Sequence, residues 1–404
     1  MKLTDKGIEY DREESLTITN KGEKMLNKHR NKGKCMYCDC TIDSINSHTI
    51  SKMGSLSTIS ANGNVGYFIS KRNELEKNLI YANLSINNAT TFKGFCSTHD
   101  SELFNLIDNN SESKTDEEIL LQSYRSVCKS LFDESYFPPL ELFEEPTIDL
   151  IKDYLRNDES YKSIDLDAEE FTIKQILDSI ISDHKNKLLE TSRILLDYKQ
   201  SIENDVKCIF PNIAKDNDGI RGTKTNKVQT SDKKVTILYN RFDWRIPVSI
   251  FNHFRFKVGK SVDSVLNFTY IPYENSAEVY WIFSSKDFDY FYKYWESFIS
   301  ERIHTLNRIE SCMMAQENWC IDPQIIDYLP EERQNVLFKD MYYSNERTNI
   351  FENYDMSIFD DIRNQLIDNN KCNANEERAK LSVPIRKNDG IRNEEFNKAI
   401  DEML

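Results

Sequence analysis

Two short motifs within the first hundred residues carry side chains that bind metal ions. Cys35-Met-Tyr-Cys38 places two thiols on one tight turn, and Cys96-Ser-Thr-His99 follows after 57 intervening residues. Thiolates and imidazole on paired turns are typical of tetrahedral Zn²⁺ sites, in which each sulfur lies about 2.3 Å from the ion. We therefore predict a structural zinc site with Cys35, Cys38, Cys96 and His99 as its ligands.

The ligand set has open alternatives. Cys40 could replace Cys38, and His48 could replace Cys38 or His99, because nothing in the residues alone decides between these donors. A Cys-x-x-Cys motif can also be a redox pair of the thioredoxin type. No βαβ pattern surrounds the motif, and the second pair of ligands favours zinc.

Short strands and turns are expected before Cys96, and helices after it. Residues 65–69 alternate between apolar and small side chains as in a strand. Residues 101–107 place their apolar side chains on one helical face, so a helix opens at the second ligand pair. A second helix begins at the acidic run 116–118 and ends before Pro138. A zinc knuckle, strands and a helix that begins on the last ligands form the treble-clef arrangement.

The order Cys35–Cys38, Asn46–Ser51, Cys96–Asp100 resembles the treble-clef form of the HNH nuclease superfamily, over residues 35–108 only. The resemblance implies a ββα unit with a structural zinc and a catalytic divalent ion between a hairpin and a helix. It implies His48 as the general base that activates water for attack on a phosphodiester, and Asp100 as a ligand of Mg²⁺ or Mn²⁺.

The chain departs from that family pattern at two positions. Ser47 stands where a metal-binding Asp or His usually precedes the base, and Thr91 stands where an asparagine is expected. His48 and Asp100 also have a structural interpretation, as a hydrogen-bonded strand residue and as an acid that suits the positive end of a helix.

Charge is distributed unevenly around a net value of −15. Residues 100–170 hold 20 acidic and 6 basic side chains, whereas residues 21–34 hold six basic side chains and one acid. Basic clusters meet phosphates, and acidic regions favour other partners or are simply solvated surface. We predict nucleic-acid contacts in the basic stretch, through Lys24, Lys28, Arg30, Lys32 and Lys34.

Residues 171–206 contain no Gly or Pro, and Ile181, Leu188, Leu195 and Ile202 repeat every seven residues. This spacing predicts one long helix that packs as in a coiled coil, within the chain or against a second copy. Residues 216–234 are polar and predict a linker. Strand-like runs follow at 235–239, 246–256, 265–271 and 279–283, and an aromatic helix spans 287–303.

The predicted fold class is α+β, with a zinc-bound treble-clef module, a helical middle and a C-terminal antiparallel sheet with helices. The expected parts are the HNH-like module 1–115, the helical region 116–215, the linker 216–234, the α+β domain 235–345 and the polar tail 346–404. One weak amphipathic helix is expected near 358–367 in that tail.

Function is expected to follow from the module at the N-terminus. The first hypothesis is a metal-dependent endonuclease that acts on DNA or RNA, as in bacterial anti-phage defence. The alternative is a non-catalytic, zinc-stabilised component of a multi-protein complex, with a protein partner or a second copy on the helical region. The absence of an apolar run of 18 residues and of a signal core predicts a cytoplasmic protein without a membrane partner, and nine cysteines suit a reducing compartment.

Overall fold

The computed structural model describes most of the 404-residue chain. The described residues are 2–4, 7–9, 31–73, 76–109, 114–134, 190–210, 226–257, 263–342, 350–369 and 372–384. The predicted contacts of Lys24, Lys28 and Arg30, and the part of the long helix before residue 190, lie outside the described residues.

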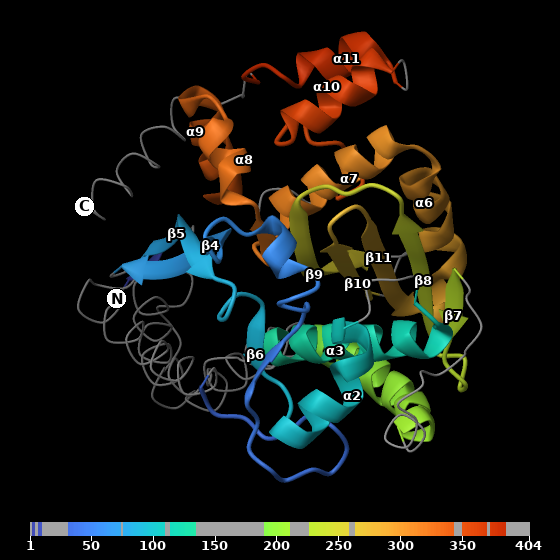
Figure 1. Cartoon of the computed structure of the whole chain (residues 1–404). Coiled ribbons are helices and arrows are strands. Elements are labelled where there is room, and N and C mark those ends of the chain that lie inside the picture. Colours follow the sequence, from blue (N-terminus) through green and yellow to red (C-terminus); the bar gives the residue numbers. More distant parts are fainter. Residues whose placement is uncertain are drawn as a thin grey trace, which may run out of the picture.

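An eight-stranded antiparallel sheet forms the centre of the molecule (Figure 1). Its strands run in the order β5-β4-β12-β9-β10-β11-β8-β7. Their bounds are β4 Asn64–Asn73, β5 Glu76–Ser85, β7 Lys227–Gln229, β8 Val235–Phe242, β9 Val248–Lys257, β10 Asp263–Pro272, β11 Ala277–Ser284 and β12 Trp319–Ile321. The predicted mixture of helices with a C-terminal antiparallel sheet is therefore confirmed.

Helices cover both faces of this sheet, as Figure 1 shows. On one face lie α3 (Asp116–Glu134) and a helix over residues 190–210, and on the other lie α6 (Phe288–Ser300) and α7 (Arg302–Ala315). Because successive strand residues face opposite ways, Tyr280 and Ile282 of β11 enter the first core, and Trp281 and Phe283 enter the second. The strand is buried on both sides, which explains the apolar run Val279–Phe283.

Two segments that the sequence assigned to separate parts join the same sheet. The β4–β5 hairpin comes from the predicted N-terminal module, yet β4 pairs with β12 through Cys320 opposite Tyr67. Strand β7 lies within the predicted linker and pairs with β8. The N-terminal and C-terminal parts therefore share one sheet, and residues of both parts pack together in the first core.

The remaining elements frame this body. A short pair, β3 (Asn46–His48) with β6 (Thr91–Lys93), precedes α2 (Ser97–Asn109), and β1 (Lys2–Thr4) pairs with β2 (Gly7–Glu9). The 3₁₀ turns are η1 Leu56–Ile59 and η3 Ser285–Asp287. The C-terminal helices are α8 Pro323–Tyr328, α9 Glu331–Tyr342, α10 Asp360–Asp368 and α11 Ala374–Ala379. Helix α10 confirms the amphipathic helix expected in the tail.

The aromatic helix predicted over 287–303 is confirmed as α6, but α6 ends at Ser300 and α7 follows at once. Phe291, Trp295 and Phe298 of α6 are buried against the sheet. The described part of the long helix, 190–210, buries Leu195 and Ile202 in the core of its own chain. Its heptad positions after residue 190 thus pack within the molecule.

Candidate metal centre

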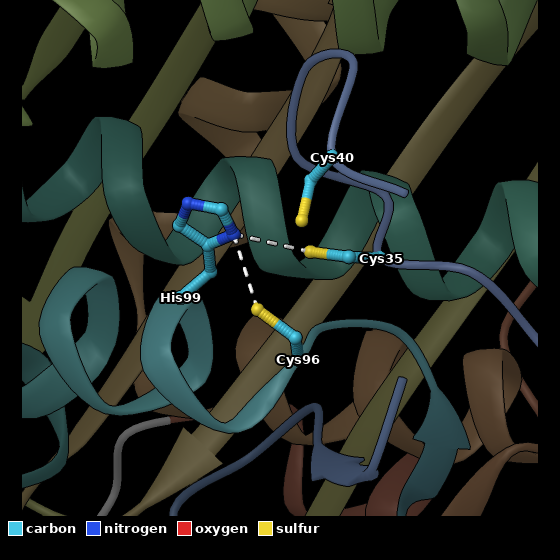
Figure 2. Close-up of side chains that lie close together, drawn as sticks. All are labelled: Cys35, Cys40, Cys96 and His99. Atoms are coloured by element: carbon cyan, nitrogen blue, oxygen red, sulfur yellow. Dashed lines mark hydrogen bonds between the residues drawn. The ribbon is translucent and has the colours of Figure 1, made fainter. Parts of the chain in front are cut away.

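Three cysteines and one histidine bring their ligand atoms together beside α2 (Figure 2). The sulfurs of Cys35, Cys40 and Cys96 and one ring nitrogen of His99 all lie within 4.8 Å of one another. His99 Nδ1 is 3.3 Å from both Cys35 Sγ and Cys96 Sγ. Ligands of tetrahedral zinc lie about 3.6 Å apart for a sulfur and a nitrogen, given bond lengths near 2.3 and 2.1 Å. The group is within metal-binding distance and its donors suit zinc.

Backbone hydrogen bonds shape the turn that carries the first two ligands. The N–H of Cys35 donates to Ile42 O at 2.9 Å, and the N–H of Cys40 donates to Tyr37 O at 3.2 Å. These bonds shape the loop over residues 35–42, in which the sulfurs of Cys35 and Cys40 lie in the same group. Their Cys-x₄-Cys spacing lies within the range found in structural zinc sites.

A close approach of backbones brings this turn to the start of α2. The N–H of Met36 donates to Gly94 O at 2.8 Å, just before Cys96. A Cβ at Gly94 would lie 2.4 Å from the ring of Phe92, so a larger residue would displace the chain that carries the second pair of ligands. Cys96 then precedes the first turn of α2, and His99 lies within that turn.

The group contains Cys40 in the place predicted for Cys38, which is not one of the four grouped residues. The backbone of Cys38 is in the left-handed region, with φ of +47°. Its N–H donates to Glu203 Oε1 at 2.9 Å. A hydrogen bond with the Cys38 sulfur is the main cause that raises the pKa of Lys207. Cys38 therefore faces the helix over residues 190–210.

Aromatic rings enclose the imidazole of His99. The ring centroids of Tyr37 and Phe210 lie 4.6 and 6.2 Å from that of His99. Burial raises the pKa of the Cys35 thiol to about 12. In such surroundings a thiolate needs a cation, and a coordinated thiol is deprotonated outright. The low-polarity setting thus suits a metal ion rather than free thiolates.

Glu203 connects the ligand turn to the rest of the fold. Its Oε1 accepts hydrogen bonds from the Cys38 N–H, from Tyr124 OH at 2.5 Å and from Lys199 Nζ at 2.7 Å. Burial alone would raise the pKa of Glu203, but these bonds outweigh it and hold the pKa below the ordinary value. Tyr124 OH also donates to Met36 O at 3.1 Å. Sequence patterns gave no indication of this residue.

The predicted catalytic residues lie on β3 and α2, close enough to influence each other electrostatically. His48 Nε2 is 3.1 Å from Ile86 O, and because a carbonyl only accepts, Nε2 carries the proton. Burial is the main cause that lowers the pKa of His48. The ring is thus neutral near pH 7 and keeps a lone pair on Nδ1. His48 contributes no atom to the zinc-type group, so it is not the alternative ligand.

Asp100 has one oxygen without a hydrogen bond in the described part of the chain. Burial raises the pKa of its carboxyl, while Arg125 and the hydroxyl of Ser47 act in the opposite direction. Ser47 Oγ in turn accepts from the Phe95 N–H at 3.2 Å. A partly buried carboxylate with a vacant acceptor next to a histidine is a candidate ligand for a divalent ion.

The side chain of Arg125, which is permanently positively charged, lies near His48 and Asp100. Arg125 of α3 is 2 % exposed and forms a two-pronged ion pair with Asp108, at 2.7 and 2.8 Å. Its guanidinium carbon lies 4.1 Å from the centre of the Phe104 ring. Among the described residues, no second group of three or more His, Cys, Asp or Glu ligands accompanies the Cys35 group. The sequence gave no indication that an arginine would enter this region.

The predicted nucleic-acid contacts can be placed only for Lys32 and Lys34, which are both exposed. Lys34 Nζ forms an ion pair of 2.6 Å with Asp43, and both side chains face solvent. The structure brings neither residue into the group formed by His48 and Asp100.

Comparison with known proteins returns no relative that could supply a function. No protein-family model matches the chain, and neither a curated protein nor a solved structure matches it. Within the described residues, no helix has both the length and the apolar character needed to span a lipid bilayer. The side-chain geometry therefore carries the functional argument.

Proposed function

We propose that the protein is a zinc-stabilised, non-catalytic binding component, in which Zn²⁺ holds a treble-clef head against α3 and the helix over residues 190–210. The supporting observation is the convergence of Cys35, Cys40, Cys96 and His99 on one point. Three sulfurs and one nitrogen fill all four positions of a tetrahedral ion. Catalytic zinc keeps one position open for water, whereas structural zinc does not.

The head offers apolar surface to a protein partner. Three of its large apolar side chains stay exposed, namely Ile42 at 59 %, Ile45 at 40 % and Met53 at 72 %. They follow the ligand turn along the chain, so the ion that shapes the turn also positions them. Contiguous exposed apolar patches mark surfaces where proteins bind one another, and we expect these three side chains to contribute to such a surface.

Metal analysis of the purified full-length protein tests the role of zinc. We expect one zinc per chain, lost in Cys40→Ser and retained in Cys38→Ser, together with a lower melting temperature when zinc is removed by a chelator. Structural zinc contributes its binding free energy to folding, so the two readouts should change together. Protein that folds and melts normally without zinc would contradict the proposal.

A second candidate is hydrolysis of DNA or RNA at His48 and Asp100. It is favoured by one observation, the neutral imidazole with a free Nδ1 next to a carboxylate with an unpartnered oxygen. Such a base would activate water, and Asp100 would help to hold Mg²⁺ or Mn²⁺, which neutralises charge on the phosphate. Arg125 and the absence of further ligands in the described part of the chain make the non-catalytic proposal the stronger one.

Nuclease assays with Mg²⁺ or Mn²⁺ separate the two candidates. Under the second candidate, zinc-loaded protein cuts DNA or RNA, and His48→Gln and Asp100→Asn lose cutting while they keep zinc. The exposed His304 provides the matched control, His304→Gln, which should cut normally. Absence of cutting by zinc-loaded wild-type protein with either ion would reject this candidate and leave the first intact.

A further inference from the structure

A cavity of about 340 Å³ lies away from the zinc-type group, where helix 190–210, the turn before β8 and the start of α6 meet. Pockets that hold small ligands begin at roughly 300 Å³. Most of its lining residues are polar or charged, with charges of both signs, but the surface that they turn toward the cavity is mainly apolar. The lining residues that matter for its chemistry are Tyr198, Lys233, Lys234, Ser264, Lys286 and Asp287.

The floor of the cavity consists of buried polar groups held in place. Ser264 is 1 % exposed and Asp287 is 7 % exposed, and Ser264 Oγ donates to Asp287 Oδ2 at 2.6 Å. Tyr198 OH donates to Val265 O at 2.9 Å and accepts from the Ser284 N–H at 2.9 Å. The Asp287 carboxylate has four acceptor positions, so it can also accept hydrogen bonds from the hydroxyls of a ligand.

Lysines from two sides form the rim. Lys233 and Lys286 are exposed and make no ion pair with another described residue. Lys234 Nζ lies 3.7 Å from Asp232 Oδ2, and it is mostly exposed as well. The lining contains the three lysines and two acids, Asp197 and Asp287, so ammonium groups outnumber carboxylates. The ammonium groups lie at the mouth of the cavity. Ammonium groups of this kind bind phosphate oxygens through charge-assisted hydrogen bonds.

The turn that carries Lys233 is strained and is fixed by its neighbours. Lys233 has φ of +58°, in the left-handed region that favours glycine. Ser201 Oγ donates to Asp232 Oδ1 at 2.6 Å, and the Ser231 N–H donates to Asp205 Oδ2 at 2.9 Å, so helix 190–210 holds the turn. Glycine would be less strained than lysine at this φ. We therefore infer that the ammonium group of Lys233 has a function.

We propose that this cavity binds a small phosphate ester with a hydroxylated body, such as a sugar phosphate or a nucleoside monophosphate. The phosphate lies at the rim between Lys233 and Lys286, and hydroxyls of the ligand reach the carboxylate of Asp287. Inorganic phosphate binds more weakly, because it cannot reach the floor and the rim together. This site is separate from the zinc-type group and goes beyond the proposed function.

Calorimetry on zinc-loaded full-length protein tests the site with ribose 5-phosphate, AMP and inorganic phosphate as probes. We expect ribose 5-phosphate or AMP to bind once per chain, and inorganic phosphate to bind more weakly. Whichever of ribose 5-phosphate and AMP binds with the higher affinity shows whether the floor of the cavity favours a sugar or a nucleoside. Binding of neither organic probe, or equal binding of inorganic phosphate, would overturn the proposal.

Two variants assign the binding to the rim. Lys233→Gly relieves the left-handed strain, so we expect its melting temperature to stay the same or to rise while its affinity falls. The double variant Lys233→Gly with Lys286→Ala should lose about a hundredfold in affinity, since each of the two charge-assisted bonds that are lost weakens binding by about tenfold. Lys293→Ala on the exposed side of α6 is the control and should bind as the wild type. Unchanged affinity in the double variant would refute the site.

Discussion

The backbone N–H of Cys38 donates a hydrogen bond of 2.9 Å to Glu203 Oε1, across 165 residues of sequence. Cys38 has a left-handed backbone conformation, and its sulfur forms a hydrogen bond with Lys207 of helix 190–210. Cys40 then occupies the fourth place in the ligand group. A distant glutamate thus contacts the backbone of Cys38, the cysteine that the ligand group leaves out.

The first prediction concerns Cys38 itself. Cys38→Gly should keep one zinc per chain and change the unfolding free energy by no more than about 1 kcal/mol, because glycine adopts positive φ without strain but loses more entropy on folding. Cys40→Gly should lose zinc. Zinc content and urea unfolding of the two variants check this pair, and zinc loss in Cys38→Gly would show that Cys38 is a ligand after all.

A second prediction concerns Glu203. Glu203→Gln removes the charge that accepts from Lys199 and the Cys38 N–H inside the fold, so we expect a loss of about 2 to 3 kcal/mol in unfolding free energy. The control is Glu190→Gln on the same helix, whose ion pair with Arg255 is 45 % and 35 % exposed. That exposed pair should contribute less than about 1 kcal/mol. If urea unfolding shows that Glu203→Gln and Glu190→Gln lower the unfolding free energy equally, then Glu203 does not connect the ligand turn to the rest of the fold.

The pH dependence of stability provides a third prediction. Burial lowers the pKa of His48 below its ordinary 6.5, so the unfolded chain binds this proton more readily than the folded chain. The stability that neutral His48 provides is complete above pH 6.5 and is lost as the pH falls through the lowered folded value. His48→Gln keeps a donor for Ile86 O and does not titrate.

The unfolding free energies of wild type and His48→Gln should therefore diverge as the pH falls from 6.5 through the lowered pKa of His48 in the folded chain. The wild type loses stability on acidification more steeply than the variant, provided that both carry zinc at each pH. Parallel curves for the two proteins would mean that His48 keeps its ordinary pKa in the folded chain.

The sequence predicted local features of the fold and the site well. The β-branched and aromatic run over residues 279–283 and the aromatic spacing around Trp295 predicted β11 and α6, because burial in a sheet and against it favours such side chains. The pairing of Cys35 with Cys96 and His99 followed from the ligand types and their spacing. In each case, the signal lies within a few residues or in the chemistry of the side chain.

Long-range relationships left no such signal. Strand β12 has three residues, which is too short for a recognisable period, yet it joins β4 to β9 and merges two predicted domains into one sheet. Arg125 occurs in a helix whose polar residues look solvated, although it is buried against Asp108. The polar composition after residue 346 likewise suggested a tail, whereas Arg363 within it is fully buried.

The last prediction tests whether that C-terminal segment is part of the folded body. Arg363 on α10 forms ion pairs with Glu310 of α7 and Glu377 of α11, and it donates to Asn307 Oδ1 at 3.0 Å. Both the arginine and Glu310 side chains are 0 % exposed. Arg363→Met would leave the buried carboxylates of Glu310 and Glu377 with too little positive charge. We expect this to lower the unfolding free energy by about 3 to 5 kcal/mol.

The matched control is Arg302→Met, because Arg302 pairs with Asp243 through side chains that are 51 % and 85 % exposed. Its loss should cost less than about 1 kcal/mol. Urea unfolding followed by tryptophan fluorescence reports the second core, in which Trp281, Trp295 and Trp319 are buried. If Arg363→Met unfolds at the same urea concentration as the control, then α10 and α11 contribute nothing to the stability of that core, and the segment behaves as the tail that its composition predicted.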